Sequence, residues 1–195
     1  MNICIFGAAS GQIDKTYIEA VEELCVELAK RGHSLVFGAG AHGLMGAAAR
    51  GFHSVKGTVT GVVPEFFRTD GVEDLYEECD EFIYTQTMAQ RKAKMEELAD
   101  CFITVPGGIG TFEEFFEVLV QRQLNLHTRP IAVYDVNNYY EALEAMLERA
   151  VEECFLRDSR KDLYRYFKEN EKEALISYIE REQKSSKSVS ELKFG

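Results

Sequence analysis

Short apolar runs alternate with segments of helical periodicity along about the first 150 residues, and this alternation constrains the fold most. We expect strands over residues 2–6, 34–37, 58–63, 81–85, 101–105 and 131–134. We expect helices over residues 15–30, from the turn after 37 to 52, 87–99, 111–126 and from 139 onward. Short apolar strands separated by helices predict a parallel sheet covered on both faces. The fold class is therefore α/β, a doubly wound, Rossmann-like sheet.

The first helix shows the pattern most clearly. Apolar side chains recur with the spacing of one helix face at Ile18, Val21, Leu24, Cys25 and Leu28. A basic residue and a glycine follow, Arg31-Gly32, which is the usual way in which a helix ends.

The chain of 195 residues favours a single domain. We expect a nucleotide-binding core over residues 1–155, a charged helical extension over 156–183, and a flexible Ser/Lys-rich tail over 184–195. No apolar run approaches the ~20 residues that span a bilayer. The N-terminus also lacks the basic segment of a signal peptide.

Charge and cysteine content exclude several classes of function. The formal net charge of −11 opposes binding to nucleic-acid polymers and to anionic membranes. The five cysteines include no CxxC pair, which fits neither a disulfide framework nor a zinc site. These features predict a cytoplasmic protein with reduced thiols, without a metal site.

The turn after the second expected strand contains Gly38, Gly40 and Gly43 in the G-x-G-x-x-G spacing of dinucleotide-binding folds. That fingerprint also requires an acid at the end of the next strand, and the first acid there is Glu65, beyond Pro64. We therefore disfavour NAD(P). Two readings stay open for these glycines: they contact a ligand, or they permit a tight turn with close helix–strand packing.

The turn after the expected strand 101–105 is a stronger candidate for binding. It reads Pro106-Gly107-Gly108-Ile109-Gly110-Thr111 and leads from a buried strand into a helix. The helix start supplies free N–H groups and partial positive charge, and glycines allow a ligand to approach closely, so a phosphate is the expected guest. The Gly-Lys-Ser/Thr of a Walker A loop is absent.

Glu113 and Glu114 follow this turn and have two readings. Thr111 and Glu114 have the spacing of a capping box, with Thr111 as the N-cap. The alternative is that the carboxylates act on a ligand or face a cation. Asp135, at the end of the last clear strand, likewise faces the ligand crevice or caps a helix.

A cation is available on the preceding helix. Met88, Arg91, Met95 and Leu98 fall on one helical stripe, which places Arg91 among apolar residues beside Lys92. A guanidinium there either needs a partner or ligand or extends to the edge of the stripe. An Arg and a Glu that converge near a phosphate-binding helix end suit hydrolysis at a sugar phosphate.

Taken together, Met88-x-x-Arg91-Lys92 and Pro106-Gly107-Gly108-x-Gly110-Thr111-x-x-Glu114 resemble the LOG ("Lonely Guy") phosphoribohydrolases. The resemblance extends from about residue 2 to 155. It implies hydrolysis of the N-glycosidic bond of AMP or a cytokinin riboside 5′-monophosphate, without an organic cofactor, by a homodimer. It also implies Arg91 and Glu114 as the catalytic pair. The residues then expected to bind substrate are Ser10, Gly40, Gly43, Met88, Lys92, Gly107, Gly108, Gly110, Thr111 and Glu113.

Two positions depart from the family pattern. Ala8 stands where the family's first turn usually has serine, which leaves Ser10 as the hydroxyl of that turn, and Ala39 replaces a glycine in the second. The older label of lysine decarboxylase requires a Schiff-base lysine and a partner for the pyridinium nitrogen of pyridoxal phosphate, and the motifs show no such arrangement. A non-catalytic nucleotide-binding protein on the same scaffold is the alternative function.

Overall fold

The computed structural model describes residues 1–71, 74–156 and 163–181. The strands are β1 (Asn2–Phe6), β2 (Ser34–Phe37), β3 (Val59–Pro64), β4 (Glu81–Thr85), β5 (Cys101–Thr104), β6 (Ile131–Asp135) and β7 (Arg165–Lys168). The helices are α1 (Lys15–Lys30), α2 (Gly43–Ser54), α3 (Glu65–Asp70), α4 (Met88–Leu98), α5 (Ile109–Gln123) and α6 (Glu141–Glu152), with a 3₁₀ turn η1 (Glu169–Glu171). Residues 172–181 are also helical.

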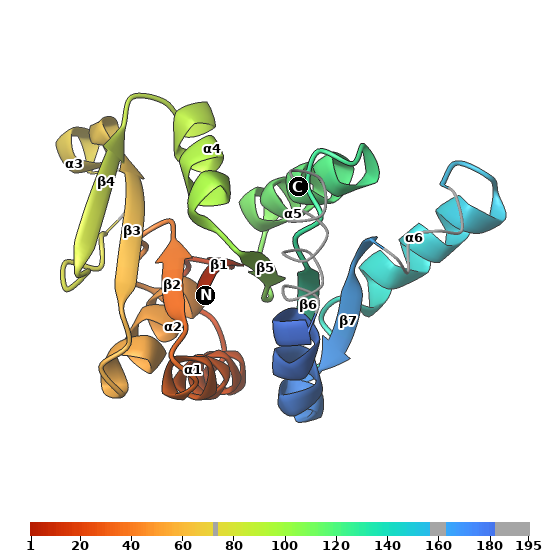
Figure 1. The fold of residues 1–195 in the computed structure, drawn as a ribbon, viewed down its shortest axis with the longest axis horizontal. Helices are drawn as coiled ribbons and strands as arrows, with labels where there is room; N and C mark the ends of the chain where they lie inside the picture. Colours follow the sequence, from red (N-terminus) through yellow and green to blue (C-terminus); the bar gives the residue numbers. More distant parts are fainter. Residues whose placement is uncertain (72–73, 157–162, 182–195) are drawn as a thin grey trace, which may run out of the picture.

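All seven strands form one parallel sheet in the order β4-β3-β2-β1-β5-β6-β7 (Figure 1). The strand order reverses between β1 and β5, and in such sheets ligands bind beyond the carboxyl ends of the strands at that point. The prediction of a doubly wound, Rossmann-like sheet is confirmed. Within the described residues, none of the helices is both long and apolar enough to cross a bilayer.

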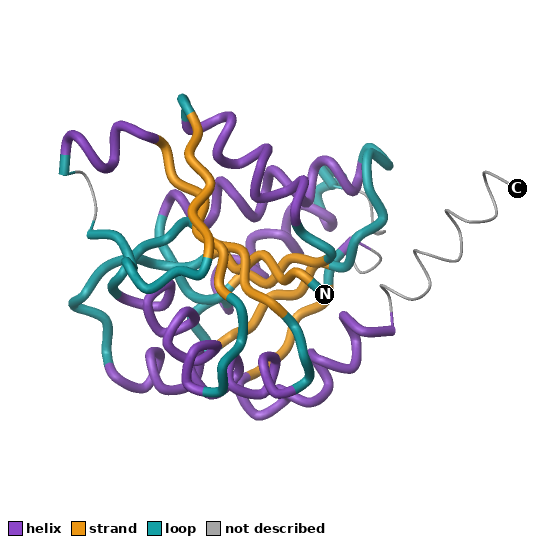
Figure 2. The backbone as a smooth tube through the Cα atoms, turned by 60° about the vertical axis from the view of Figure 1, so that its left-hand side comes forward, coloured by secondary structure: helices purple, strands orange, loops and turns teal. Residues whose placement is uncertain are grey.

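Helices cover both faces of the sheet (Figure 2). Because alternate residues of a strand point to opposite faces, the central strands contribute side chains to two separate hydrophobic cores. Ile3 and Ile5 of β1 face α1, α2 and helix 172–181. Cys4 and Phe6 of the same strand face α4 and α5. The turns after the buried strands β1, β2, β5 and β6 therefore lead to helices on one of two opposite faces.

The first helix forms as its sequence predicts. The Asp14 side chain caps it by accepting a hydrogen bond from the Thr16 backbone N–H at 2.9 Å. Gly32, with φ +77°, follows Arg31 and ends it in a conformation that favours glycine. Its buried residues include the predicted Val21, Leu24, Cys25 and Leu28.

The prediction of a wholly helical segment over 156–183 is wrong at Arg165–Lys168, which forms the strand β7 beside β6. The buried Asp135 carboxylate accepts hydrogen bonds from the Tyr166 hydroxyl and from Lys168 Nζ and so holds this strand in place. Residues 172–181 are helical as expected. The predicted tail over 184–195 lies outside the described residues.

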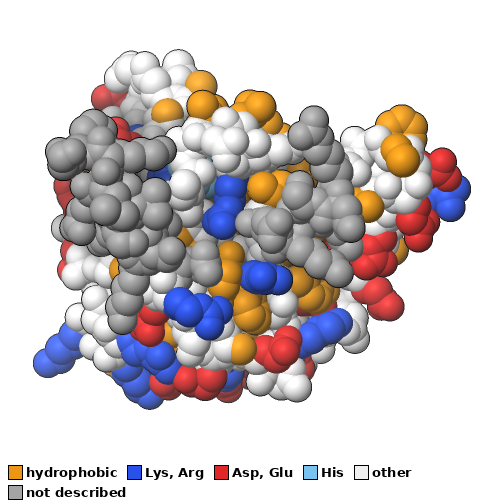
Figure 3. Space-filling view, turned by 45° about the vertical axis from the view of Figure 1, so that its right-hand side comes forward, with side chains coloured by type: hydrophobic (Ala, Val, Ile, Leu, Met, Phe, Trp, Pro, Cys, Tyr) orange, Lys and Arg blue, Asp and Glu red, His pale blue; other side chains and the backbone are white. Residues whose placement is uncertain are grey.

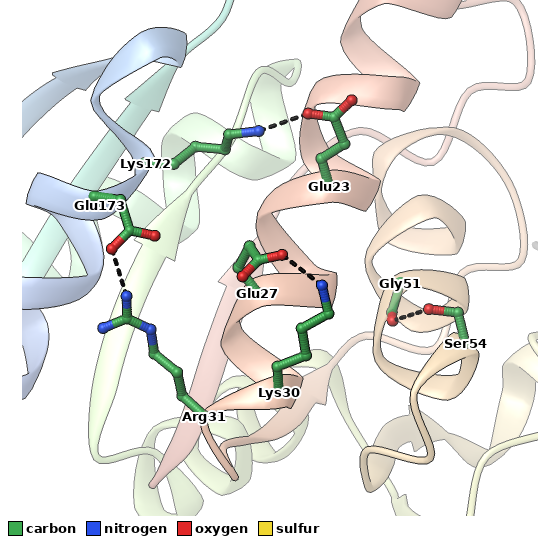
Figure 4. Close-up of polar contacts among 8 residues, drawn as sticks. All are labelled: Glu23, Glu27, Lys30, Arg31, Gly51, Ser54, Lys172 and Glu173. Atoms are coloured by element: carbon green, nitrogen blue, oxygen red, sulfur yellow. Dashed lines mark hydrogen bonds and ion pairs between the residues drawn. The ribbon is translucent and has the colours of Figure 1, made fainter.

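Figure 4 shows the ion pairs that fasten helix 172–181 to α1. Lys172 Nζ lies 2.5 Å from Glu23, and Arg31 lies 2.5 Å from Glu173. Leu175 and Ile179 of this helix are buried in the core of the same face. Residues 165–181 thus add β7 to the sheet and a helix to the layer that contains α1 and α2.

Helix α6 projects from the body of the molecule in Figure 1. Within this helix, which is described throughout, no residue is buried. Acidic and hydrophobic side chains lie side by side on the projecting part of the surface at the right of Figure 3. Met146 of α6 is among the exposed large hydrophobic residues of the described chain.

Candidate active site

The predicted cation and carboxylate meet at the carboxyl edge of the sheet. Arg91 of α4 and Glu114 of α5 come from helices on the same face, and Arg91 Nη1 lies 3.6 Å from Glu114 Oε1. Both side chains are largely buried, with exposed fractions of 6% and 14%. The reading in which Arg91 extends to the surface is therefore wrong.

Two backbone carbonyls fix the guanidinium of Arg91. Its Nε donates to the Val62 carbonyl at 3.1 Å, and its Nη2 donates to the Gly38 carbonyl at 3.2 Å. Val62 lies in β3 and Gly38 directly follows β2, so the carboxyl edge of the sheet sets where the charge lies. A buried charge satisfied in this way has a defined orientation, which a catalytic or binding cation requires.

Gly38 makes room for this arginine. A Cβ built on Gly38 lies 1.7 Å from Arg91 Nη2, which no real side chain tolerates. The sequence singled out Gly38 only as part of the G-x-G-x-x-G spacing, not as the neighbour of Arg91. Because Gly38 and Arg91 are 53 positions apart in the sequence, no local pattern predicts this contact.

Burial raises the pKa of Glu114 to about 7, because desolvation outweighs the opposing charge of Arg91. A carboxyl group with a pKa in this range exchanges protons near neutral pH, as a general acid or base must. This pKa separates Glu114 from an ordinary surface glutamate.

The capping-box reading of Thr111 and Glu114 is wrong. Helix α5 begins at Ile109 with Gly108 as its N-cap, so Thr111 is already inside the first turn. The N-cap therefore lies three residues earlier than the capping pattern indicates. Thr111 is buried, and its Oγ1 lies against Gly107, where a Cβ would be 2.1 Å away.

Lys92 is not available as a free cation. Its Nζ pairs with Glu113 and lies 2.7 Å from Glu117, a residue that the sequence analysis did not single out. Burial alone would lower the pKa of Lys92, but these hydrogen bonds outweigh it and raise the pKa above its usual value. Lys92 and Glu113 are thus brought together beside the Arg91–Glu114 pair.

The glycine turn before α5 is open to solvent at its tip. Gly108, Ile109 and Gly110 are exposed, and among the described residues no atom lies within 4 Å of a Cβ built on Gly108 or Gly110. The first N–H groups of α5 have no acceptor inside the helix. The turn therefore offers an anion-binding end to a 15-residue helix.

A cavity of about 270 Å³ lies between this turn and the turn after β1. Its lining includes Ser10, Tyr17, Pro106, Gly107, Gly108 and Tyr139. The structure therefore brings Ser10 together with the glycine turn before α5, across the point where the strand order reverses. Ala8 lines the cavity as well, with only a methyl group where the family pattern has a hydroxyl.

The second glycine turn has a packing role. Gly43 adopts φ +57°, and a Cβ there would lie 2.6 Å from the Ala8 carbonyl. That carbonyl accepts the backbone N–H groups of Leu44 and Met45, at 2.8 and 3.2 Å. The start of α2 is thus already occupied by a protein oxygen, which supports the reading of close packing. Gly40 is buried and forms an isolated bridge with Leu75.

Met88 and Asp135 are two further candidate residues, and neither belongs to the Arg91–Glu114 pair. Met88, the first residue of α4, is 40% exposed near the rim of the site. Asp135 accepts a hydrogen bond from the Tyr140 backbone N–H at 2.9 Å, but Tyr140 is itself the N-cap of α6 and that helix has no side-chain cap, so the capping reading of Asp135 is wrong. Within the described ranges, no group of three His, Cys, Asp or Glu side chains is arranged to hold a metal ion.

Comparison with solved structures shows the fold. A molybdenum cofactor binding protein from Rippkaea orientalis superposes with a TM-score of 0.67, at 19% identity, over 91% of this chain and 96% of its own. The molybdenum cofactor carrier protein MCP from Chlamydomonas reinhardtii gives a TM-score of 0.66 at 18% identity, with the same coverage. Identities this low carry no information on the ligand.

Comparison with protein families and curated proteins is more specific. The model of a family described as "Possible lysine decarboxylase" matches residues 45–178. The cytokinin riboside 5′-monophosphate phosphoribohydrolases LOG2 and LOG5 of Arabidopsis thaliana are 38% and 34% identical to this chain. The alignments cover 79% and 83% of this chain, and 71% and 70% of those proteins. The chain therefore belongs to the LOG phosphoribohydrolase family, to which the description "Possible lysine decarboxylase" is attached.

Proposed function

We propose that the protein hydrolyses the N-glycosidic bond of a nucleoside 5′-monophosphate, giving a free base and ribose 5-phosphate. The substrate is AMP or a cytokinin riboside 5′-monophosphate, and the second of these is the substrate that the names of the relatives give. One observation carries the proposal: a buried carboxyl group with a pKa near 7 lies against a fixed arginine, close to a helix N-terminus that can hold a phosphate.

In this reaction a water oxygen bonds to C1′ of the ribose while the bond from C1′ to the base breaks. The electron pair of that bond goes to the base, which takes up a proton. Glu114 accepts the proton of the attacking water or stabilises the positive charge that develops on the ribose. Arg91, held by two carbonyls, keeps the Glu114 carboxylate oriented and supplies positive charge at the site.

We further propose that the start of α5 binds the 5′-phosphate. Backbone N–H groups from Gly108 to Thr111 favour a dianion there, and Ser10 lies across the same cavity. Gly40 and Gly43 instead pack the second glycine turn. The remaining proposed substrate-binding residues are Met88, Lys92, Gly107, Gly110 and Glu113. Of these, Lys92 and Glu113 act as a pair, since they bind each other in the described structure.

The proposal extends to assembly and setting. We propose a homodimer that acts in the cytoplasm without an organic cofactor. The exposed hydrophobic residues Met88, Ile109 and Val120 on α4 and α5 support a protein interface near the site. The five cysteines are all unpaired, which suits a reducing compartment. Light scattering coupled to size-exclusion chromatography tests the dimer.

The decisive experiment is to incubate the purified protein with AMP and with isopentenyladenosine monophosphate and to measure the release of free base. We expect release from at least one of them. If both nucleotides bind and neither base appears, the protein is a nucleotide-binding protein on this scaffold instead.

The variants Glu114→Gln and Arg91→Ala assign the roles within the site. Both should lose turnover, and Glu114→Gln should keep its thermal stability because Glu114 does not cap α5. Full activity of either variant would refute the proposed catalytic pair. For Glu114→Gln, loss of activity that merely follows unfolding would do so too.

A further inference from the structure

Two consecutive tyrosines hold the backbone that leads into the phosphate-binding turn. The Tyr140 hydroxyl donates to the Val105 carbonyl at 2.7 Å, and the Tyr139 hydroxyl donates to the Gly107 carbonyl at 2.6 Å. Both tyrosines lie in the turn between β6 and α6, more than 30 residues along the chain from the carbonyls that they bind. The proposed function has so far given neither of them a role.

The turn that presents these tyrosines is itself firmly anchored. Asn137 and Asn138 both adopt positive φ values, +54° and +58°, which reverse the chain just before Tyr139. The Asn137 amide donates to Thr16 Oγ1 of α1 at 2.8 Å, and the Tyr140 backbone N–H is held by Asp135. These hydrogen bonds hold the turn that carries Tyr139, and so they fix the position from which its hydroxyl reaches the glycine turn.

Ring packing adds to this support. The ring of Tyr139 lies edge-on to those of Tyr17 and Tyr140, with centroid distances of 6.2 and 5.1 Å. Edge-to-face pairs of this kind do not depend on the hydroxyl group. Removing only the hydroxyl of Tyr139 therefore leaves the ring in place and isolates its hydrogen bond to Gly107.

The peptide between Gly107 and Gly108 needs such a restraint. It has glycine on both sides, so side chains do not select one orientation of its plane. All described peptide bonds are trans, so the Gly107 carbonyl and the Gly108 N–H point in opposite directions across one plane. A hydroxyl that holds the carbonyl thereby fixes the direction of the N–H at the N-cap of α5.

We propose that Tyr139 is a positioning residue for phosphate binding. Its hydroxyl selects the orientation of the Gly107–Gly108 peptide in which the Gly108 N–H serves the phosphate group of the ligand. This inference rests on the proposed function for the nature of the ligand, a phosphate monoester of ribose, but it concerns binding and not bond cleavage. Within the described residues, Tyr139 contacts Gly107, Tyr17 and Tyr140 and not the Arg91–Glu114 pair, so it should influence affinity rather than the chemical step.

The test compares the wild type with Tyr139→Phe by calorimetric titration with ribose 5-phosphate and, separately, with adenosine, which lacks the phosphate. We expect Tyr139→Phe to bind ribose 5-phosphate about two- to tenfold more weakly, the effect of one hydrogen bond. Adenosine affinity should stay unchanged. In turnover assays with AMP, KM should rise by a similar factor while kcat is preserved.

Tyr134→Phe is the matched control. The Tyr134 hydroxyl also donates to a backbone carbonyl, that of Glu169 at 3.1 Å, but away from the glycine turn. We expect this variant to bind ribose 5-phosphate as the wild type does. Melting temperatures of both variants report whether either substitution acts through general stability.

Three results would overturn the inference: unchanged affinity of Tyr139→Phe for ribose 5-phosphate, an equal loss for adenosine, or an equal loss in Tyr134→Phe. A wild-type protein that fails to bind ribose 5-phosphate would also overturn it, since no phosphate site would exist to be positioned. A wild type that binds ribose 5-phosphate but leaves AMP intact would refute hydrolysis alone. In that case the affinity ratio still decides the role of Tyr139.

Discussion

The position of Arg91 depends on the absence of a side chain elsewhere in the chain. Gly38 lies so close to the guanidinium that even a methyl group there would occupy the place of Nη2. The arginine in turn satisfies the Gly38 carbonyl. A sequence shows that a glycine follows a strand, but not which side chain from a distant helix fills the space above it. The sequence therefore predicted the motifs that contain Arg91 and Glu114, but not the contact between Arg91 and Gly38.

Gly38→Ala should therefore abolish activity by displacing Arg91 from Glu114 and from the Val62 carbonyl. We also expect a loss of about 1–3 kcal/mol in the free energy of unfolding, the usual result of overpacking. Gly11→Ala is the control, because a Cβ on Gly11 meets its nearest neighbour at an ordinary 3.9 Å. Activity assays and urea unfolding measure both effects. An active Gly38→Ala variant would show that the placement of Arg91 is not required.

The raised pKa of Glu114 predicts how stability depends on pH. Burial raises it to about 7 in the folded protein, whereas an unfolded glutamate titrates near about 4.3. Between these values the folded state keeps a proton that the unfolded chain has lost, so stability falls as pH rises through this window. The decrease amounts to at most about 4 kcal/mol.

Glu114→Gln removes this titration. We therefore expect the free energy of unfolding of this variant, relative to the wild type, to increase between about pH 5 and pH 7. Glu97→Gln, a change at an exposed carboxylate of α4, should instead run parallel to the wild type. Urea titrations at both pH values give the comparison, and parallel curves for Glu114→Gln would argue against an elevated pKa.

At the scale of elements, the sequence predicted best where local periodicity and burial agree. The helix over 15–30 was placed to the residue, since its apolar stripe and its terminal glycine are local signals. Helix α5 was predicted to begin two residues late, because Thr111 and Glu114 have the spacing of a capping box. That interpretation gave Glu114 a structural role, which the observed start of the helix removes.

Strand β7 was missed for a different reason. Its four residues begin and end with a cation, Arg165 and Lys168, in a segment rich in both signs of charge. What makes it a strand is pairing with β6 and the buried carboxylate of Asp135, about 30 residues away. No local sequence pattern predicts pairing with β6 or with Asp135, so the segment was predicted to be helical.

The attachment of β7 leads to a prediction for Asp135. Asp135→Ala leaves the Tyr166 hydroxyl, Lys168 Nζ and the Tyr140 N–H without this acceptor, so we expect a loss of about 1–3 kcal/mol in stability. Glu173→Ala breaks only the exposed ion pair with Arg31 and should cost less than about 1 kcal/mol. Chemical unfolding of the two variants makes the comparison. Equal effects would mean that Asp135 does not hold the strand.

For the whole molecule, the alternation of strands and helices was enough to predict a parallel sheet with two covered faces, and the structure confirms it. The sequence also predicted a ligand site at the carboxyl edge of the sheet, because glycine turns cluster at the carboxyl ends of strands. The contacts made by single side chains could not be predicted, since they join elements that are distant in the sequence. Arg91 to Gly38 and Tyr139 to Gly107 are both of this kind.

The overall charge bears on how an anionic substrate is captured. With a net charge of −11, the long-range field of the protein repels a nucleotide, and Lys92 is already balanced by Glu113 and Glu117. Capture must then come from short-range contacts, chiefly the N–H groups at the start of α5 and the charge of Arg91.

Salt screens the repulsion as well as any attraction, with a Debye length of about 10 Å at 0.1 M. We therefore expect kcat/KM for AMP to stay flat or to rise slightly between about 50 and 300 mM NaCl. Initial rates over this range of NaCl concentration provide the test. The buffers must contain no sulfate, since sulfate competes for a phosphate site. A steep fall in kcat/KM would mean that favourable long-range attraction guides the substrate, which this distribution of charge does not supply.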